Sequence, residues 1–387
     1  MFTSGSTGLP KGVINTHHNI TTNWQQIVQV FPTMQAGFTL IDWLPWNHTF
    51  GSNHNLGLTL FNGGSLYIDS GNPTPKGILN TVQNLREIQP DFYFNVPKGF
   101  EELIPFLKND DELRTKFFSN LKFMFYAGAG MPQHVWDAYE ELSFQTTGKR
   151  LLMSTGLGCT EACPSAMFNT HFGSFAGMLG VPVHGLELKL LSNAGKLEVR
   201  FKGENIMPGY WRNPEATSKA FDEEGFYITG DALKFVEDTD PNKGMVFDGR
   251  IAEDFKLDTG TWVSVGTLRA KLIAAGNGFI QDVVITGHDK PYIGAIVFLE
   301  AGYLKEKMNI KNKTAFEISE NKEVNKLLDE IINNSKNNST GSSTVIKKAI
   351  VAPFELSTEN GEITDKGSIN QRAILAHRAA IVERLYI

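Results

Sequence analysis

The stretch MFTSGSTGLPKGV, residues 1–13, places a segment rich in glycine and hydroxyl side chains directly before Lys11. Small side chains let backbone N–H groups close around a polyanion, the hydroxyls add donors, and the ammonium supplies counter-charge. The Walker motif is excluded, because a proline precedes the lysine and a glycine follows it. The stretch therefore predicts a phosphate-binding loop. A flexible Gly/Ser turn is the alternative interpretation, although the Pro-Lys-Gly ending is not typical of a linker.

The composition is that of an ordinary globular protein. The 387 residues suffice for two or three domains, and 41% of them are apolar and 20% charged. A net charge of −6 argues against non-specific nucleic-acid binding, and no run of about 18 apolar residues predicts a membrane span. Cys159 and Cys163 are too few for a disulfide framework and lack zinc-ligand spacing. We expect them to be packing residues in a reducing, cytoplasmic setting.

Alternating strand and helix patterns predict an α/β sheet in the first half of the chain. Short apolar runs predict strands at residues 37–44, 65–68, 91–96, 121–126 and 149–153. Helices are predicted between them at residues 20–31, 75–87, 100–107 and 133–142. Residues 154–161 are expected to form the turn after the last strand. A sheet of this kind carries its binding site at the strand ends.

The pattern of predicted strands and helices changes twice after this sheet. Short strands from about Gly180 predict a β-rich subdomain, and a mixture of strands and helices follows Gly249. In that last region Ser319 is expected to cap a charged helix, and the tail from Ser368 onward is expected to be one helix. The predicted regions are residues 1–179, 180–249 and 250–387.

The loop and several later segments, in the same order, resemble the adenylate-forming superfamily of acyl-CoA synthetases, peptide-synthetase adenylation domains and luciferases. The segments are WLPWNHTFG (43–51), TGLGCTE (155–161), GYWRNPEAT (209–217), TGD (229–231), GR (249–250) and residues 361–372. Residues 251–269 and the ending GEITDKGSINQRA most resemble feruloyl-CoA synthetase-like ligases. The resemblance implies a large α/β domain with a β-rich subdomain and a small mobile α+β C-terminal domain. Family members carry a further stretch before the loop, and only Met1 and Phe2 precede it here, so we expect an N-terminally truncated chain.

The resemblance also implies roles for individual residues. Those implied to bind ATP are Thr3, Ser4, Gly5, Ser6, Thr7, Gly8, Lys11, Gly128, Ala129, Gly156, Leu157, Gly158, Asp231 and Arg250. Among them the loop and its lysine would hold the β- and γ-phosphates. Asp231 would bind the ribose hydroxyls, and Arg250 the ribose or phosphate oxygens.

The residues implied to take part in the chemistry form a second group. Thr160 would contact the α-phosphate and Glu161 would ligate Mg²⁺, a hard cation that prefers oxygen ligands; a helix-capping pair is the alternative. His48 would line or gate the acyl pocket, unless it is a satisfied core or surface histidine. Lys366 would be the adenylation lysine, although it stands as Thr-Asp-Lys-Gly rather than directly after a glycine, and a solvated turn lysine is its alternative. Lys256 and Gly260 would belong to the strand presented for thioester formation.

The function expected from these residues is that of an ATP-dependent carboxylic acid–CoA ligase. An acyl-adenylate would form with release of pyrophosphate, and the acyl group would pass to CoA, with an aromatic or feruloyl-like acid preferred over a fatty acid. ATP, Mg²⁺ and CoA are the expected cofactor and co-substrates. Two alternatives stay open: an adenylation enzyme that loads a carrier protein, and a truncated nucleotide-binding homologue without turnover.

Overall fold

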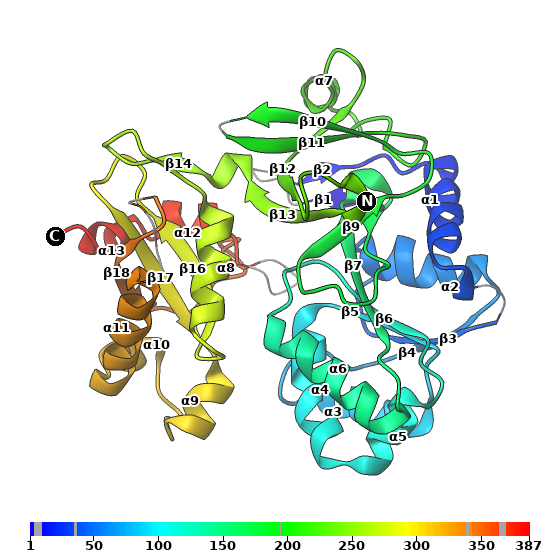
Figure 1. Cartoon of the computed structure of the whole chain (residues 1–387), viewed down its shortest axis with the longest axis horizontal. Coiled ribbons are helices and arrows are strands. Elements are labelled where there is room, and N and C mark those ends of the chain that lie inside the picture. The colour runs from blue at the N-terminus through cyan, green and yellow to red at the C-terminus, as the bar shows by residue number, and fades with distance from the viewer. Residues whose placement is uncertain (4–9, 35–36, 194, 338–340, 342, 364–368) are drawn as a thin grey trace. The chain divides into compact units, whose positions relative to one another are not determined.

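A computed structural model describes residues 1–3, 10–34, 37–193, 195–337, 341, 343–363 and 369–387. Within these residues the contacts divide the chain into two compact units (Figure 1). The first unit holds residues 1–192, 196–229 and 233–247, and the second holds residues 193–195, 230–232 and 248–387.

Five neighbouring parallel strands form the centre of the first unit. They are β4 (Ser65–Ile68), β3 (Thr39–Asp42), β5 (Phe92–Asn95), β6 (Phe123–Tyr126) and β7 (Leu152–Gly158). Each pairs in parallel with its neighbour in that order. Their carboxyl ends therefore lie at one edge of the sheet, where the loops that follow them gather.

The sheet continues beyond β7 with further strands. The added strands are β8 (Ser165–Phe168), β9 (Met178–Pro182), β10 (Glu187–Asn193), β11 (Lys196–Lys202), β12 (Tyr227–Phe235) and β13 (Met245–Arg250). The pairing of β7 with β8, of β8 with β9 and of β9 with β13 is antiparallel. Within the described residues the order is β10-β11-β12-β13-β9-β8-β7-β6-β5-β3-β4. The expected α/β class is confirmed.

Helices bury both faces of the parallel strands. Because strand residues alternate, Phe92 and Phe94 of β5 point into one core and Tyr93 into the other. The first face is covered by α1 (His17–Val30) and α2 (Gly57–Phe61). The second is covered by α3 (Ile78–Glu87), α4 (Pro97–Asn109), α5 (Asp111–Ser119) and α6 (Gln133–Thr147), grouped together in Figure 1.

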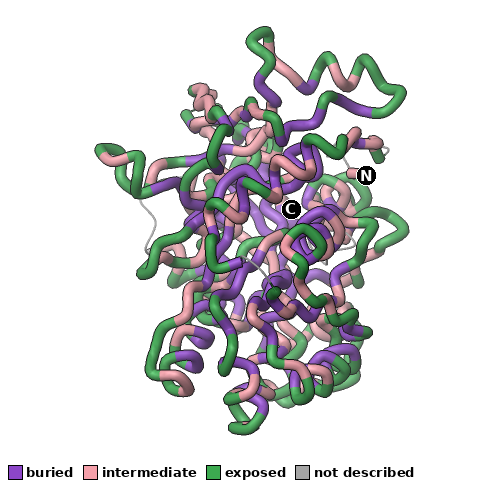
Figure 2. Tube along the Cα trace, turned by 90° about the vertical axis from the view of Figure 1, so that its right-hand side faces the viewer, coloured by how far each residue is buried: buried purple, intermediate pink, exposed green. Residues whose placement is uncertain are grey.

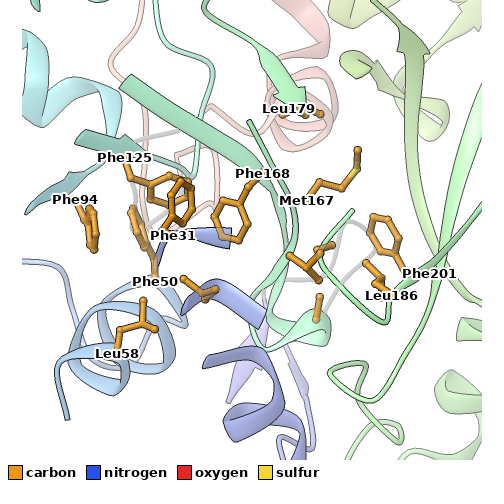
Figure 3. Packing of buried hydrophobic residues seen from close by; sticks show 14 of the residues in the cluster. Phe31, Phe50, Leu58, Phe94, Phe125, Met167, Phe168, Leu179, Leu186 and Phe201 are labelled. Carbon is orange, nitrogen blue, oxygen red and sulfur yellow. The ribbon is translucent and has the colours of Figure 1, made fainter. Parts of the chain in front are cut away.

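Aromatic rings dominate the first of these cores. Phe31, from the end of α1, stacks on Phe123 with ring centroids 4.6 Å apart and meets Phe168 edge-on at 5.2 Å. Phe125 contacts Phe168 at 5.5 Å, so β6, β8 and α1 share one cluster (Figure 3). Such pairs add about 0.5–1.5 kcal/mol each beyond the area they bury. Exposed residues concentrate in the connecting loops (Figure 2).

The turn expected at residues 154–161 is wrong, because β7 continues through Gly158. Glycines normally weaken strands, but here close packing requires them. A Cβ at Gly156 would lie 2.0 Å from the carbonyl oxygen of Met167, and one at Gly158 would lie 2.3 Å from that of Pro164. The glycines of this segment therefore let β8 approach β7, and the turn begins only after them.

In its described residues, the second unit contains two small sheets and its own helices. Its elements are β14 (Phe255–Lys256), β15 (Trp262–Val263), α8 (Val265–Ala275), β16 (Ile280–Thr286), β17 (Ile293–Leu299), α9 (Ala301–Lys307), α10 (Ala315–Ser319), α11 (Lys322–Asn337), β18 (Ile346–Val351), α12 (Gln371–His377) and α13 (Ala379–Arg384). β16 and β17 are antiparallel, whereas β17 and β18 are parallel. Buried aliphatic residues cover both faces of the sheet formed by β16, β17 and β18.

Two helix predictions in this unit need correction. Ser319 ends α10 instead of capping the charged helix, because Asn321 accepts the amides of Glu323 and Val324 at 2.9 and 3.2 Å and caps α11. The tail forms two short helices rather than one. Arg378 interrupts them, and its guanidinium binds both carboxylate oxygens of the buried Glu362 at 2.7 and 2.9 Å.

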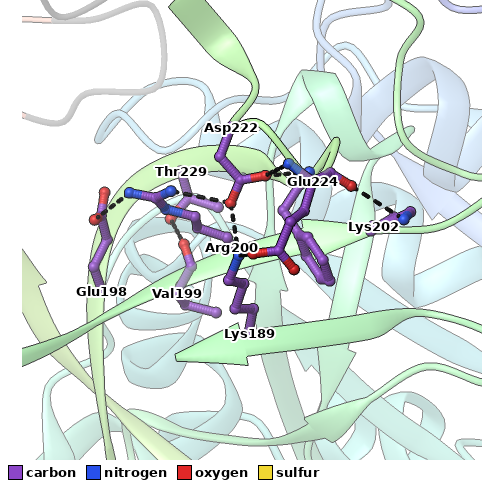
Figure 4. Close-up of polar contacts among 9 residues, drawn as sticks. Lys189, Glu198, Val199, Arg200, Lys202, Asp222, Glu224 and Thr229 are labelled. Carbon is purple, nitrogen blue, oxygen red and sulfur yellow. Dashed lines mark hydrogen bonds and ion pairs between the residues drawn. The ribbon is translucent and has the colours of Figure 1, made fainter. Parts of the chain in front are cut away.

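The β-rich part of the first unit is held by a cluster of charges around Asp222 (Figure 4). Its carboxylate accepts from Lys189 at 3.1 Å and from Arg200 at 3.0 Å, which joins β10 and β11 to the turn before β12. Burial alone would raise the pKa of Asp222, but the amide of Phe226 and the two cations outweigh it and hold the pKa well below its usual range.

We predict that Asp222→Asn lowers the free energy of unfolding at pH 7 and that this loss shrinks in acid. A depressed carboxyl pKa gives stability that is present above the unfolded value of about 3.9 and is lost as the pH falls towards the folded value. Urea unfolding at pH 7, 5 and 3 measures the difference. The exposed Asp238, changed to Asn, is the control; a loss that is independent of pH contradicts the prediction.

Candidate active site

The ends of the predicted phosphate loop are held side by side. β1 (Phe2–Thr3) pairs antiparallel with β2 (Lys11–Gly12), so that Thr3 lies opposite Lys11. The remaining predicted loop residues, Ser4, Gly5, Ser6, Thr7 and Gly8, lie outside the described residues. The geometry of the site therefore begins at the two ends of the loop.

Tyr210 brings Lys11 and Glu161 together within the first unit. The Lys11 Nζ lies 4.6 Å from the centroid of the Tyr210 ring, a cation–π contact. The hydroxyl of the same tyrosine donates to Glu161 Oε1 at 3.0 Å. A cation from the loop and a carboxylate from the turn after β7 thus share one aromatic side chain. Motif spacing did not identify Tyr210, because its contacts come from segments distant in the chain.

The turn that carries Thr160 and Glu161 is buried and rigidly bonded. Both residues belong to η3 (Thr160–Ala162) and are only 7% and 6% exposed. The carbonyl oxygen of Glu161 accepts the Met207 amide at 2.8 Å, and that of Thr160 accepts the Asn15 side chain at 3.1 Å. Cys159, the residue before η3, makes no side-chain cap hydrogen bond to this turn within the described residues.

Burial and the neighbouring charge keep the Tyr210 phenol protonated. Burial raises the pKa of Tyr210, and the negative charge of Glu161 raises it further. The pKa of Tyr227, which hydrogen-bonds to Tyr210, is raised in the same way, first by burial. At neutral pH Tyr210 is therefore a donor to Glu161.

Three asparagines spaced four residues apart hold this turn and the segments next to it; Asn15 lies just before α1, and Asn19 and Asn23 lie within it. Asn15 binds the carbonyl of Thr160, and Asn19 donates to the carbonyls of Glu204 and Ile206 at 2.7 and 3.1 Å. Asn23, fully buried, donates to the Ser165 carbonyl at 2.7 Å and accepts its amide at 3.1 Å. Asparagines that recur at a helical period on the one buried face of a helix are the signal by which the sequence could have revealed this role.

The two histidines of the segment after β3 have different environments. His48 is half-buried, and its Nδ1 accepts the Phe50 amide at 3.1 Å. His54 lies in the π-helical segment η2 (Phe50–Leu56) and stacks on Phe125 at 5.1 Å. Burial lowers the pKa of His54 to about 4, so the ring is neutral at physiological pH. Sequence reasoning selected His48 and missed His54, whose surroundings are those of an aromatic core residue.

The predicted adenine and acyl segments follow β6 and occupy β7. Gly128 and Ala129 come directly after β6 and are exposed, and Gly128 has a φ of +89°, which favours glycine. Gly156, Leu157 and Gly158 form the end of β7 and pair with β8. These backbone segments lie at the carboxyl ends of the parallel strands.

The second unit carries the other predicted residues. Asp231 Oδ1 and Arg250 Nε form an ion pair at 3.2 Å between β12 and β13, with the arginine side chain 54% exposed. Lys256 lies opposite Trp262 in the β14–β15 hairpin, with its Nζ 5.8 Å from that ring, and Gly260 turns the hairpin with a φ of +77°. The positive φ that this hairpin turn requires explains why residue 260 is a glycine.

Lys366 lies outside the described residues, but the residues that flank it are paired. Ile363 and Ile369 form an antiparallel bridge. Next to the bridge, the carboxylate of Glu362 accepts from Arg378 and from the Ser357 amide at 2.9 Å. Hydrogen bonding to Arg378 lowers the pKa of Glu362, which stays ionised.

Glu161 offers the kind of ligand that magnesium prefers. Tyr210 occupies Oε1, and within the described residues no hydrogen-bond donor is assigned to Oε2, so a carboxylate oxygen is left for a hard cation. The same part of the chain holds no group of three or more His, Cys, Asp or Glu side chains that could enclose a metal. The donor set therefore fits an ion held jointly with a phosphate ligand rather than a cage of protein ligands.

Among the described helices, none is long and apolar enough to cross a membrane.

Two protein-family models match most of the chain. Residues 1–211 match the model of the AMP-binding enzyme, and residues 259–387 match that of the AMP-binding enzyme C-terminal domain. A long-chain-fatty-acid–CoA ligase of Salmonella typhimurium is 32% identical over 249 residues, which cover 61% of this chain and 42% of the relative. An anthranilate–CoA ligase of Pseudomonas aeruginosa is 27% identical over 270 residues, covering 68% of this chain and 48% of the relative. The aligned part thus spans less than half of each of these relatives.

Solved structures share the fold across the whole chain. An anthranilate CoA ligase in complex with anthranoyl-AMP superimposes with a TM-score of 0.73 at 22% identity, covering 99% of this chain and 67% of that one. The adenylation domain of a carboxylate reductase from Mycobacterium chelonae gives a TM-score of 0.74 at 21% identity, covering 100% of this chain and 59% of that one. These likenesses confirm the adenylate-forming fold.

We predict that Asn23→Ala destabilises the first unit by about 2 kcal/mol, because it leaves the buried amide of Ser165 without its partner, whereas the Ser165 carbonyl keeps the bond from Asn205. Thermal and urea unfolding measure the loss. The exposed Gln25 on the same helix, changed to Ala, controls for helix propensity. Equal stability of the two variants would show that the asparagine series does not hold the turn.

Proposed function

Because the chain belongs to the AMP-binding enzyme family, we propose that it is an ATP-dependent ligase that activates a carboxylic acid and transfers the acyl group to CoA. The acid would attack the α-phosphate, pyrophosphate would leave, and the acyl-adenylate would then react with the thiol. The observation that carries this proposal is the arrangement of Lys11 and Glu161 around Tyr210, beside the two ends of the Gly/Ser loop. ATP needs both a cation for its phosphates and a carboxylate for its metal ion.

The first unit would bind the nucleotide phosphates. Lys11 and the loop amides would neutralise the β- and γ-phosphates, and Thr160 would contact the α-phosphate. Glu161 would hold Mg²⁺, which on binding would supply further charge neutralisation of the phosphates. Gly128, Ala129 and residues 156–158 would lie along the adenine and the acyl group, where small side chains leave room.

The second unit would act as the C-terminal domain of the family. Asp231 and Arg250 would bind the ribose, with Arg250 also able to reach phosphate oxygens. Lys366 would stabilise the carboxylate and α-phosphate during adenylation, and the Lys256–Gly260 hairpin would serve the thioester step. We propose that residues 250–387 exchange between two positions for the two half-reactions.

The acid is proposed to be aromatic, with His48 lining its pocket. Support comes from the resemblance of residues 251–269 to feruloyl-CoA synthetase-like ligases and from the matched anthranilate–CoA ligase. A long-chain fatty acid is the competing substrate class, because the long-chain-fatty-acid–CoA ligase shares more identity. A cytoplasmic location is part of the proposal.

We predict pyrophosphate release that depends on both ATP and an aromatic acid. The assay mixes the full chain with ATP, Mg²⁺ and a panel of benzoic, cinnamic and long-chain fatty acids, with and without CoA. The expected result is fastest release with an aromatic acid and conversion to acyl-CoA when CoA is present. Acid-dependent release without thioester formation would favour loading of a carrier protein, and ATP binding without any release would favour a nucleotide-binding homologue.

We predict that Lys366→Ala abolishes adenylation, by about 10²-fold or more, but leaves the conversion of a supplied acyl-adenylate to thioester intact. The two half-reactions are measured separately, the first by pyrophosphate release and the second by acyl-CoA formation. The exposed Lys347, changed to Ala, is the matched control. Survival of both half-reactions in the Lys366 variant would reject this lysine.

A further inference from the structure

We propose that Tyr210 is a positioning residue that keeps Lys11 and Glu161 apart and so reserves both charges for ligands. This inference rests on the proposed function for the identity of the ligands, a nucleotide polyphosphate and its magnesium ion. Its structural content, however, concerns only three side chains of the first unit. Tyr210 itself would touch neither the reacting carboxylate nor the α-phosphate.

The two polar contacts of Tyr210 use different parts of the side chain. Lys11 Nζ lies against the ring, 4.6 Å from its centroid, whereas Glu161 Oε1 binds the hydroxyl at 3.0 Å. Within the described residues Lys11 and Glu161 form no ion pair with each other. An ammonium and a carboxylate that can reach one another in a buried setting attract strongly, and pairing would neutralise both. The aromatic ring gives the lysine ammonium a cation–π contact without neutralising its charge. The phenol gives one carboxylate oxygen a hydrogen bond without supplying a charge.

The backbone fixes the tyrosine firmly enough for this role. Tyr210 pairs with Val13, the Trp211 amide donates to the Gly12 carbonyl at 2.7 Å, and the Tyr210 amide donates to Thr217 Oγ1 at 2.9 Å. Gly209, which precedes it, has a φ of +151°, and a Cβ there would lie 2.6 Å from Thr217 Cγ2. The segment cannot move without breaking its pairing with residues 12–14, which also holds the end of β2.

A second tyrosine completes the arrangement on the carboxylate side. Tyr227 hydrogen-bonds to Tyr210, and Tyr210 donates to Glu161. Because Tyr210 donates its hydroxyl hydrogen to Glu161, Tyr227 can bond to that hydroxyl only as a donor. Removing only the Tyr210 hydroxyl should free Glu161, whereas removing the ring should also release Lys11.

The geometry is tested first without any nucleotide. Lysines are labelled by reductive ¹³C-methylation, which keeps their charge, and the Lys11 signal is assigned by its absence in Lys11→Arg. We expect a ring-current shift of this signal in the wild type and in Tyr210→Phe, and its loss in Tyr210→Leu. An unshifted Lys11 signal in the wild type, or one that is unchanged in Tyr210→Leu, overturns the proposal.

The consequence for ligands is tested by calorimetric titration with ATP at several Mg²⁺ concentrations. Tyr210→Phe should need about tenfold more Mg²⁺ for half-maximal MgATP binding but bind metal-free ATP as the wild type does. Tyr210→Leu should also weaken metal-free ATP binding by about tenfold, and this loss should largely vanish in the Lys11→Ala background. Equal Mg²⁺ dependence in the wild type and Tyr210→Phe, or additive losses in the double variant, contradicts the proposal.

Controls separate this inference from misfolding and from the proposed function. Thermal unfolding reports whether the Tyr210 variants keep the fold, and the exposed Tyr67, changed to Leu, should alter neither readout. A wild type that binds MgATP but releases no pyrophosphate with any acid would defeat the proposed ligase and leave the role of Tyr210 standing. A wild type that binds no ATP would defeat the proposed function, and the nucleotide-free lysine signal would then decide the inference.

Discussion

The antiparallel pairing of residues 12–14 with residues 209–211 is the constraint on which the candidate site depends. It ties the strand that ends the phosphate loop to a segment about two hundred positions later in the chain. That segment is itself bound to the turn after β7 through the Met207 amide and the Glu161 carbonyl. Loop, turn and bridging segment are thereby joined by main-chain hydrogen bonds, which do not depend on the identity of the side chains.

Side chains then decide what the joined backbone can do. The aromatic core packs β5, β6 and β8 so closely that polar groups near it must be bonded or neutral, and burial lowers the pKa of His54 accordingly. Asn15 and Asn23 meet that requirement for residues 160–165. Charge is thus confined to a few positions, among which Lys11 and Glu161 share Tyr210. Burial makes the charge of Glu161 more effective, because less water screens it.

Sequence reasoning predicted the α/β class, most of the parallel strands and the family, because apolar runs and ordered motifs are local patterns. It failed where packing decides the outcome. Gly156 and Gly158 were interpreted as a turn, since their fitness for β7 depends on how closely β8 approaches. His54, Asn23 and Tyr210 were missed for the same reason: their roles come from partners that lie 40 or more positions away and leave no mark on neighbouring residues. The motifs identified Lys11 and Glu161 separately, and only the structure shows the tyrosine between them.

Asn15, Asn19 and Asn23 also bear on the order in which the site assembles. Their bonds to the carbonyls of Thr160, Ile206 and Ser165 join residues between 142 and 187 positions apart, so closing them carries a large entropic penalty until the intervening sheet has formed. During synthesis α1 leaves the ribosome long before Ser165 or Ile206 exists, and its amides must stay hydrated until then. The candidate site is therefore among the last parts of the first unit to assemble. A nascent chain that has not yet reached the segment after β11 cannot form the site.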